Sequence, residues 1–409
     1  MHFKNYINIF KDPNFLKIFI SSNLLNFAQS LVNITIIWLV YNQTNSAIFI
    51  AIAVTSMQLP GVLLAPFLGI IVDRFSTKLV ASISLLTKSI LFVCLGFLIN
   101  SNNNVLLFLF LGINSLTGPI IDSCINVLIK ELFDNEKLII TNSLMTVSFD
   151  LAYIFGTLAS GLVVITGKSK ITFVAIAVIF ILISWILNSI RHDTISKPQI
   201  SLSFTKSIQH MSTSLKFLWQ QRPLFNVIIV SFLWNLLIWG SLPVILPIFS
   251  KFFKRSILIY SSFNSIQSIG IIIGSLFAGM LTVKFDKVKI IYLSIVSQSL
   301  FLMIFSLQKN ALLALSLFLL AGICSAPCMI YKTTYLQECI PENRRGQVFL
   351  LNSTLSTVSY PIGNFLTALL SKKLTNHIGI ILFVFSIFLI IFCIFLYYNG
   401  IKFSLSQKR

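Results

Sequence analysis

The sequence predicts an all-α integral membrane protein with twelve transmembrane helices in two six-helix halves. Only 10% of its 409 residues are charged and 56% are hydrophobic, whereas soluble domains are about one-quarter charged. Its apolar runs have the roughly 20-residue length that a helix needs to cross a bilayer, and they do not alternate as strands of a membrane barrel would. The expected spans are 15–41, 46–72, 79–99, 104–129, 138–165, 171–190, 223–250, 257–283, 288–307, 311–336, 347–370 and 377–398.

The two halves repeat each other at an offset of 210 residues. Pro13-Asn14-Phe15 matches Pro223-Leu224-Phe225, and Gly69 matches Gly279. Two halves that move about a central site are the plan of many secondary transporters. The expected organisation is an N-terminal half at 1–190, a cytoplasmic linker at 191–222 and a C-terminal half at 223–409.

The basic residues predict the orientation in the membrane. Twenty of the thirty lie in or next to the termini and the loops that follow even-numbered spans, eight lie in the other loops, and Lys88 and Lys332 lie well inside spans. The positive-inside rule therefore places both termini in the cytoplasm, and we expect a multi-pass protein of a bacterial plasma membrane. Because this topology accounts for much of the +19 net charge, nucleic-acid binding is not expected.

The first span carries a row of polar residues on one helical face. Ser22, Asn26, Gln29 and Asn33 follow one another at steps of four, three and four. Such side chains either line a cavity or bond to neighbouring helices. We expect Asn26, Gln29 and Asn33 to line a substrate cavity. The eighth span has a similar row, formed by Ser261, Ser265, Ser268 and Ser275.

The end of the second span carries a family motif. The stretch Gly69-Ile-Ile-Val-Asp73-Arg74-Phe75-Ser-Thr-Lys78 resembles the loop 2–3 signature of the major facilitator superfamily. The resemblance implies alternating access, close helix packing at Gly69, and a cytoplasmic charge latch built from Asp73, Arg74 and Lys78. Because the second half has Val283 where the first has Asp73, only one half offers the full latch.

Three further stretches resemble the macrolide-efflux and enterobactin-exporter-like branch. They are Asp12-Pro13-Asn14-Phe15, Trp38-Leu39-Val40-Tyr41 and the segment 340–348, whose Arg344 and Arg345 we assign to the cytoplasmic gate. This resemblance implies proton-driven export of an amphipathic small molecule, either a drug such as a macrolide or a siderophore. Import of a nutrient or metal chelate is the alternative, because the fold does not set the direction of transport.

Four ionisable residues lie well inside the predicted spans: Lys88, Asp122, Asp150 and Lys332. A charge at the bilayer centre costs about 2.5–3.5 kcal/mol on insertion scales, so a functional role is the default expectation. Asp122 and Lys332 occupy equivalent positions in the two halves, where they would form a central pair or bind oppositely charged parts of one substrate. Lys88 lies on a helix that is peripheral in the resembling family, where it would snorkel or pair with an acidic neighbour.

Asp150 is the expected proton-coupling acid, with Asp122 second. Apolar burial favours the neutral carboxylic acid, which then loads and releases a proton as its surroundings change. The alternative is a protonated Asp150 that donates a structural hydrogen bond. Histidines are not placed for this role, because all lie near span ends or in loops: His2, His192, His210 and His377.

Enzymatic activity is not expected. The sequence lacks the HExxH, GxxxxGK[ST] and GxSxG motifs, so an ion gradient is the expected energy source. Its six cysteines have no ligand-like spacing, and we expect neither a metal nor a cofactor. The expected partners are a small-molecule substrate, protons and the lipid bilayer, with the chain acting as a monomer.

Overall fold

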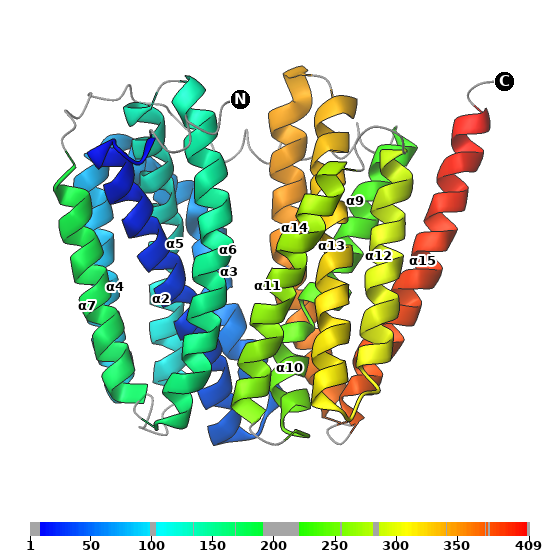
Figure 1. Cartoon of the computed structure of the whole chain (residues 1–409), viewed down its shortest axis with the longest axis horizontal. Coiled ribbons are helices and arrows are strands. Elements are labelled where there is room, and N and C mark those ends of the chain that lie inside the picture. Colours follow the sequence, from blue (N-terminus) through cyan, green and yellow to red (C-terminus); the bar gives the residue numbers. More distant parts are fainter. Residues whose placement is uncertain are drawn as a thin grey trace. The chain divides into compact units, whose positions relative to one another are not determined.

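The computed structural model describes residues 9–98, 104–133, 135–167, 169–190, 221–253, 256–280, 286–340, 342–372, 374 and 377–406. These residues form helices and no strands (Figure 1). The helices of the N-terminal half are α2 (Pro13–Thr44), α3 (Ala47–Arg74), α4 (Thr77–Leu98), α5 (Asn104–Leu132), α6 (Asn135–Ile165) and α7 (Ser169–Asn188). Those of the C-terminal half are α9 (Arg222–Trp234), η1 (Asn235–Trp239), α10 (Leu242–Ser250), α11 (Ser256–Met280), α12 (Lys287–Phe305), α13 (Ala311–Cys339), α14 (Glu342–Ser371) and α15 (Gly379–Ser406).

Each predicted span falls on one of these helices, with α9, the π-helical η1 and α10 together forming the seventh span. The prediction of an all-α fold with twelve long helical segments is therefore confirmed for the described residues. Eleven of the segments are long and apolar enough to cross a membrane. The remaining segment, α14, begins with charged residues and is rich in Asn, Ser and Thr between Leu351 and Asn364, which lowers its hydropathy.

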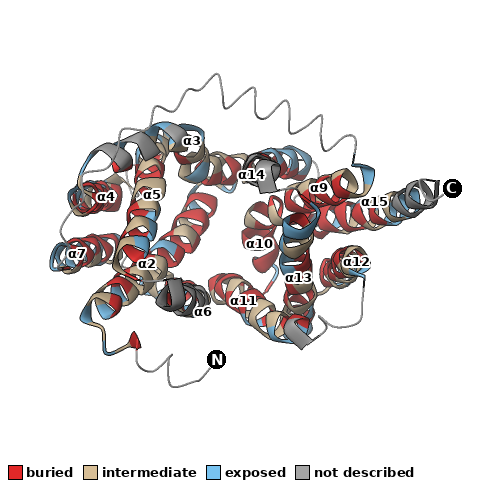
Figure 2. Ribbon diagram, turned by 90° about the horizontal axis from the view of Figure 1, so that it is seen from above, coloured by how far each residue is buried: buried red, intermediate tan, exposed pale blue. Residues whose placement is uncertain are grey.

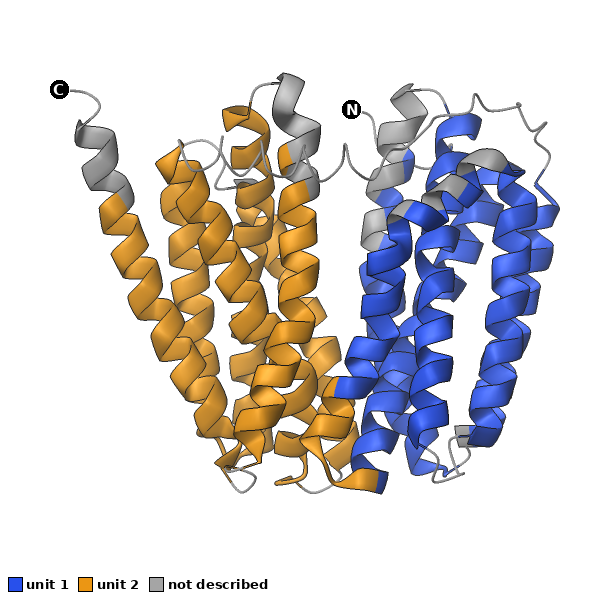
Figure 3. Cartoon of the chain, turned by 180° about the vertical axis from the view of Figure 1, so that it is seen from behind, with its two compact units in different colours: residues 1–43, 52–201 blue, residues 44–51, 202–409 orange. Residues whose placement is uncertain are grey.

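The contacts divide the chain into two compact units (Figure 3). The first unit comprises Met1–Gln43 and Ile52–Ser201, and the second comprises Thr44–Ala51 and Leu202–Arg409. The short segment at the α2–α3 turn thus groups with the second unit, which the sequence does not indicate. Residues 191–220 of the predicted linker lie outside the described residues.

Close packing of backbones holds the first unit together. A Cβ atom placed on Gly156 of α6 would lie 2.5 Å from the carbonyl oxygen of Phe27 on α2 and would also overlap Ser30 Oγ. Gly61 of α3 faces the carbonyl of Ser115 on α5 in the same way, and its amide donates to Ser115 Oγ at 3.0 Å. Small residues commonly bring membrane helices together like this, and here they fix α6 against α2 and α3 against α5.

Glycine contacts and aromatic rings build the second unit. Gly270 and Gly274 of α11 pack directly on the α13 backbone near Gly322, leaving no room for a side chain. The rings of Phe249, Phe263, Phe305 and Phe318 form a cluster with neighbouring centroids 4.9–5.4 Å apart. Figure 2 shows the buried residues of each unit along the faces where its own helices meet.

Candidate functional site

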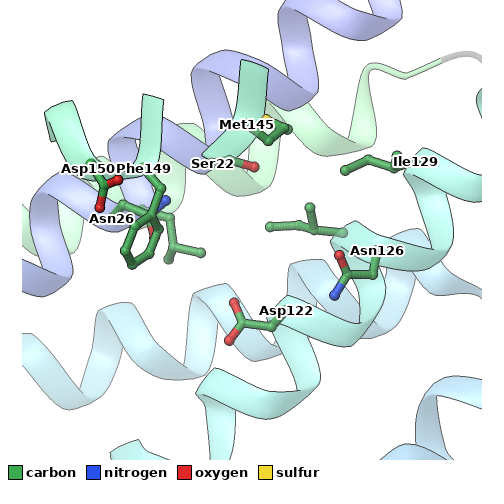
Figure 4. Close-up of a pocket in the computed structure, with 10 residues that line it drawn as sticks. Ser22, Asn26, Asp122, Asn126, Ile129, Met145, Phe149 and Asp150 are labelled. Carbon is green, nitrogen blue, oxygen red and sulfur yellow. The ribbon is translucent and has the colours of Figure 1, made fainter. Parts of the chain in front are cut away.

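A cavity of about 670 Å³ opens in the first unit. Three helices form its wall: α2, α5 and α6. Figure 4 shows Asp150, Phe149 and Asn26 grouped together, with Asp122 and Asn126 on another helix across open space. The lining residues are Ser22, Leu25, Asn26, Asp122, Ile125, Asn126, Ile129, Met145, Phe149 and Asp150.

The helical repeat explains why these side chains share one wall. Ser22 and Asn26 are four residues apart on α2, and Asp122 and Asn126 are four apart on α5, so each pair lies on one helical face. On α6, Met145 and Phe149 have the same spacing, with Asp150 beside them. The contact between Gly156 and Phe27 then keeps this face of α6 close to α2.

The two carboxylates of the cavity are accessible to water. Asp122 has an exposed side chain and Asp150 a partly exposed one, although protein atoms surround Asp122 on most sides because it faces the cavity. Leu25, Ile125 and Phe149 contribute apolar atoms to the same cavity. The arrangement combines two groups that can exchange protons with surfaces that can hold an apolar molecule.

Lys88 of α4 lies behind this wall and is only 1% exposed. Its Nζ donates a hydrogen bond of 2.9 Å to Gln29 Oε1 on α2 and lies 5.5 Å from the ring centroid of Phe180 on α7. The ammonium group also interacts electrostatically with Asp122. Of the two expected roles for Lys88, snorkelling to the membrane surface does not agree with its burial, and its hydrogen-bond partner is the side-chain oxygen of Gln29.

Packing of α4 on α7 keeps Lys88 in the interior. Ser89 Oγ donates to the carbonyl oxygen of Ala177 at 2.9 Å, and the Phe92 ring stacks on Phe173 and meets Phe180 at a centroid distance of 5.3 Å. Because Lys88 lies on this same buried face, its side chain points into the unit and away from lipid. The helix that the family resemblance made peripheral therefore contributes a charge close to the cavity.

The residues predicted to line the cavity separate into distinct environments. Asn26, Asp122 and Asp150 line it, whereas Gln29 accepts the hydrogen bond from Lys88 and Asn33 is partly exposed without being among the lining residues. Lys332 lies on α13 of the second unit, partly exposed, and interacts electrostatically with Cys328.

The predicted gate residues are described only at Lys78, whose ammonium group donates to the carbonyl oxygen of Ile190 just beyond the end of α7. Lys17 donates in the same region, to the carbonyl oxygen of Ser189 at 2.6 Å. Two cations at a helix C-terminus satisfy its free carbonyls and match its negative dipole end. The remaining gate residues have side chains outside the described part of the chain: Gly69, Asp73, Arg74, Arg344 and Arg345.

The serine row of the eighth span has a structural explanation. Ser261, Ser265, Ser268 and Ser275 of α11 each donate to a backbone carbonyl three or four residues earlier in the same helix. These bonds within α11 account for the serine row, so cavity lining is not needed to explain it.

The sequence analysis did not predict Asn126, Met145 and Phe149 as lining residues. It also did not predict that Lys88 is buried and bonded to Gln29. Asn126 had a usable signal, because it lies one helical turn after Asp122. Lys88 had one too, since Leu85, Phe92 and Leu95 share its helical face. No group of three or more His, Cys, Asp or Glu residues that would suit a metal ion occurs in the described ranges.

Long apolar helices together with a water-accessible cavity that carries ionisable residues are typical of membrane transport proteins. The family model of the Major Facilitator Superfamily matches residues 18–364 and 237–402, so the chain belongs to this superfamily and is a secondary transporter of small molecules. No curated protein sequence matches it significantly.

Solved structures of the same fold cover almost the whole chain. The nucleoside transporter NupG has a TM-score of 0.75 at 15% identity, covering 94% of this chain and 98% of its own. A bacterial homologue of the human lysosomal transporter Spinster, inward-facing and unoccupied, has a TM-score of 0.73 at 13% identity, with coverages of 96% and 97%. A POT family transporter in complex with 5-aminolevulinic acid has a TM-score of 0.74 at 12% identity, with coverages of 95% and 96%. At these identities the likeness concerns the fold alone.

Proposed function

We propose that this protein is a proton-driven exporter of an amphipathic small molecule, a drug such as a macrolide or a siderophore, working as a monomer by alternating access. Asp150 is the main coupling acid and Asp122 the second. The observation that carries the proposal is that both carboxylates face one cavity, together with amide groups and apolar side chains. Ligand sites for small molecules commonly have volumes of about 300–1,000 Å³, a range that includes this cavity.

A carboxylate in such a cavity suits proton coupling for a physical reason. Apolar neighbours such as Leu25 and Phe149 favour the neutral acid, whereas water or a bound cation favours the carboxylate. Changing the access of Asp150 from one side of the membrane to the other therefore changes its proton occupancy. A cargo that occupies the same space would make that change depend on transport.

The cytoplasmic gate is part of the same proposal. Asp73, Arg74 and Lys78, with Gly69 at the preceding turn, would hold one conformation closed together with Arg344 and Arg345. Lys78 donates a hydrogen bond to the carbonyl oxygen of Ile190, just beyond the C-terminal end of α7. This bond supports a gate position where the first unit meets the predicted cytoplasmic linker. Exposed ion pairs are worth about 0–1 kcal/mol each, so such a latch can open at modest cost.

The test uses purified full-length protein in liposomes that contain a pH-sensitive dye and an acidic lumen. Compounds of three classes are added outside: a macrolide, a permanently charged organic cation and a citrate-type siderophore. An exporter in the inside-out orientation exchanges luminal protons for the cargo, so the lumen becomes less acidic when the correct class is added. Asp150→Asn should abolish the response and Asp122→Asn should reduce it.

Asp12→Asn is the matched control. Asp12 also carries a carboxylate, but it lies at the start of α2, where its Oδ1 accepts the Asn14 amide at 2.9 Å. An asparagine keeps that acceptor, so transport should be unchanged. A full response in Asp150→Asn would contradict the coupling role. Protons and cargo moving in the same direction would replace export by the import alternative.

A further inference from the structure

A groove of about 480 Å³ opens in the second unit between α11 and α12, with α13 as its floor. Figure 2 shows α13 between these two helices. We propose that the groove binds an anionic phospholipid, with one acyl chain between α11 and α12 and the phosphate of the headgroup on Lys289. This inference goes beyond the proposed function, because it involves neither the cargo nor the coupling ion.

The walls of the groove suit an acyl chain. Phe277 of α11 and Leu293 of α12 line it, and their side chains are 57% and 62% exposed. Both helices are long and apolar enough to cross a membrane, so these exposed side chains meet lipid chains. Ser297 adds little polarity to the wall, because its Oγ donates to the carbonyl oxygen of Ser294 in the same helix at 3.1 Å.

Backbone contacts give the groove a fixed shape. Gly274 of α11 lies directly on the carbonyl of Ile323 on α13, where a side chain would overlap the oxygen. Pro327 has no amide hydrogen and cannot donate to this carbonyl four residues earlier, so the oxygen is left facing α11. Because α11 and α12 both pack along α13, the two walls are held apart on one floor. A preformed groove loses little conformational freedom when a chain binds.

Lys289 is the one charged residue among those that line the groove. It lies in the first turn of α12, is exposed, and forms no hydrogen bond or ion pair with other described residues. Its neighbours are already engaged, since Lys287 forms an ion pair with Glu338 on α13. Asp286 caps α12 by accepting the Val288 amide at 3.0 Å. Lys289 thus offers a free cation at the end of an apolar groove, which complements a phosphate attached to an acyl chain.

The length of the groove matches one leaflet of the bilayer. Lys289 and Ser297 are eight residues apart on α12, about 12 Å, and half of the hydrocarbon core is about 15 Å thick. Tyr292 near the start of α12 packs on Tyr397 in the C-terminal part of α15, with ring centroids 5.4 Å apart. The groove therefore opens in the leaflet on the side of the C-terminus. The basic residues predict that this side is cytoplasmic, where anionic lipids are enriched.

Selectivity should come from the headgroup. An acyl chain gains little by leaving other lipid chains for an apolar groove, because both surroundings are equally apolar. One basic residue near the membrane surface should favour an anionic over a zwitterionic headgroup by about fivefold. Lys289 therefore sets which lipid occupies the groove, and the walls set where its chain lies.

The experiment uses full-length protein in phosphatidylcholine nanodiscs that contain a small fraction of a photoreactive lipid. The probe carries a diazirine on one acyl chain and has either a phosphatidylglycerol or a phosphatidylcholine headgroup. After illumination, peptide mass spectrometry compares cross-links in the groove with those at the exposed Phe388 and Ile391 of α15. In the wild type, the anionic probe should label the groove about fivefold more than the zwitterionic probe, whereas both should label α15 equally.

Three variants separate the headgroup from the chain. Lys289→Gln removes the cation and should make the two probes label the groove equally. Ser297→Phe fills the groove and should lower its labelling by both probes, which keeps the test decisive if Lys289→Gln does not fold. Lys309→Gln is the matched control, because Lys309 is also exposed and without a partner in the described ranges but follows the opposite end of α12. It should leave the labelling ratio unchanged.

Several results would overturn the inference. Equal labelling of the groove by the two probes in the wild type would remove the selectivity, and an unchanged ratio in Lys289→Gln would remove the role of the cation. An equal loss of the ratio in Lys309→Gln would show a general effect of surface charge. A groove that neither probe labels would show that another protein chain covers it. None of these results depends on proton exchange, so the inference and the proposed function can fail separately.

Discussion

Substituting Gly156 by alanine tests the helix contact that shapes the cavity. The new Cβ would lie 2.5 Å from the carbonyl oxygen of Phe27 and would overlap Ser30 Oγ. Serine can rotate away, but the carbonyl belongs to the α2 backbone and cannot. To restore an ordinary contact, α6 must therefore move away from α2 by about 1 Å.

The expected cost follows from this displacement. Overpacking in a well-packed interior costs about 1–3 kcal/mol, and replacing glycine by alanine within a helix returns up to about 1 kcal/mol. We expect a net loss of about 1–2 kcal/mol in the free energy of unfolding. Because Asp150 lies six residues before Gly156, about 9 Å along the helix, the cargo-dependent proton exchange in liposomes should weaken as well.

Gly118→Ala provides the matched control for this variant. Gly118 lies in α5, and a Cβ atom placed there meets nothing within 4 Å. It should be as stable as the wild type or slightly more stable. Both variants are compared in detergent by denaturant titration and by thermal unfolding followed through tryptophan fluorescence. If Gly156→Ala matches Gly118→Ala in stability, the close approach of α6 to α2 is wrong, and so is the geometry derived for the cavity.

Two further predictions concern other parts of the chain. The buried Trp234 Nε1 donates to Gln298 Oε1 at 2.7 Å, so Gln298→Leu leaves this donor without an acceptor and should lower the free energy of unfolding by about 1–3 kcal/mol. Adding Trp234→Phe to the same chain should recover part of that loss. Additive effects of the two substitutions in a double-mutant cycle would contradict the bond. Lys78→Met should lower the free energy of unfolding by about 1 kcal/mol, because it removes the donor to the carbonyl oxygen of Ile190. Lys17→Met should lower it less, because the bond of Lys17 to Ser189 is more exposed. If denaturant titration finds both variants as stable as the wild type, neither lysine caps α7.

Most of the fold could be predicted from the sequence because bilayer thickness sets the length of each apolar run. This constraint acts locally, so the span at 104–129 was found without knowledge of its neighbours, and α5 occupies Asn104–Leu132. The break in the seventh span was not predicted. Its π-helical segment, Asn235–Trp239, packs on α14, where Gly363 lies directly on the carbonyl of Leu236, and that contact between distant segments has no local signal.

The candidate site was less accessible to sequence reasoning. The cost of placing charge in a membrane singled out Asp122 and Asp150, which do line one cavity. It did not reveal which charges interact, because that depends on how α2, α4 and α5 are turned relative to one another. The offset between the halves suggested Lys332 of the second unit as the partner of Asp122, and this stays a prediction. Within the first unit, the sequence did not indicate that Lys88 is buried and bonded to Gln29.

The contrast between the two carboxylates follows from the helices that carry them. Asp122 lies on α5, which packs on α4, where the ammonium group of Lys88 is held by Gln29 and Phe180 of two further helices. Asp150 lies on α6, and the wall around it contains no basic side chain among the described lining residues. A carboxylate changes its charge more easily during a transport cycle where no fixed cation lies near it. On physical grounds, therefore, Asp150 is better suited than Asp122 to be the main coupling acid, with Asp122 second.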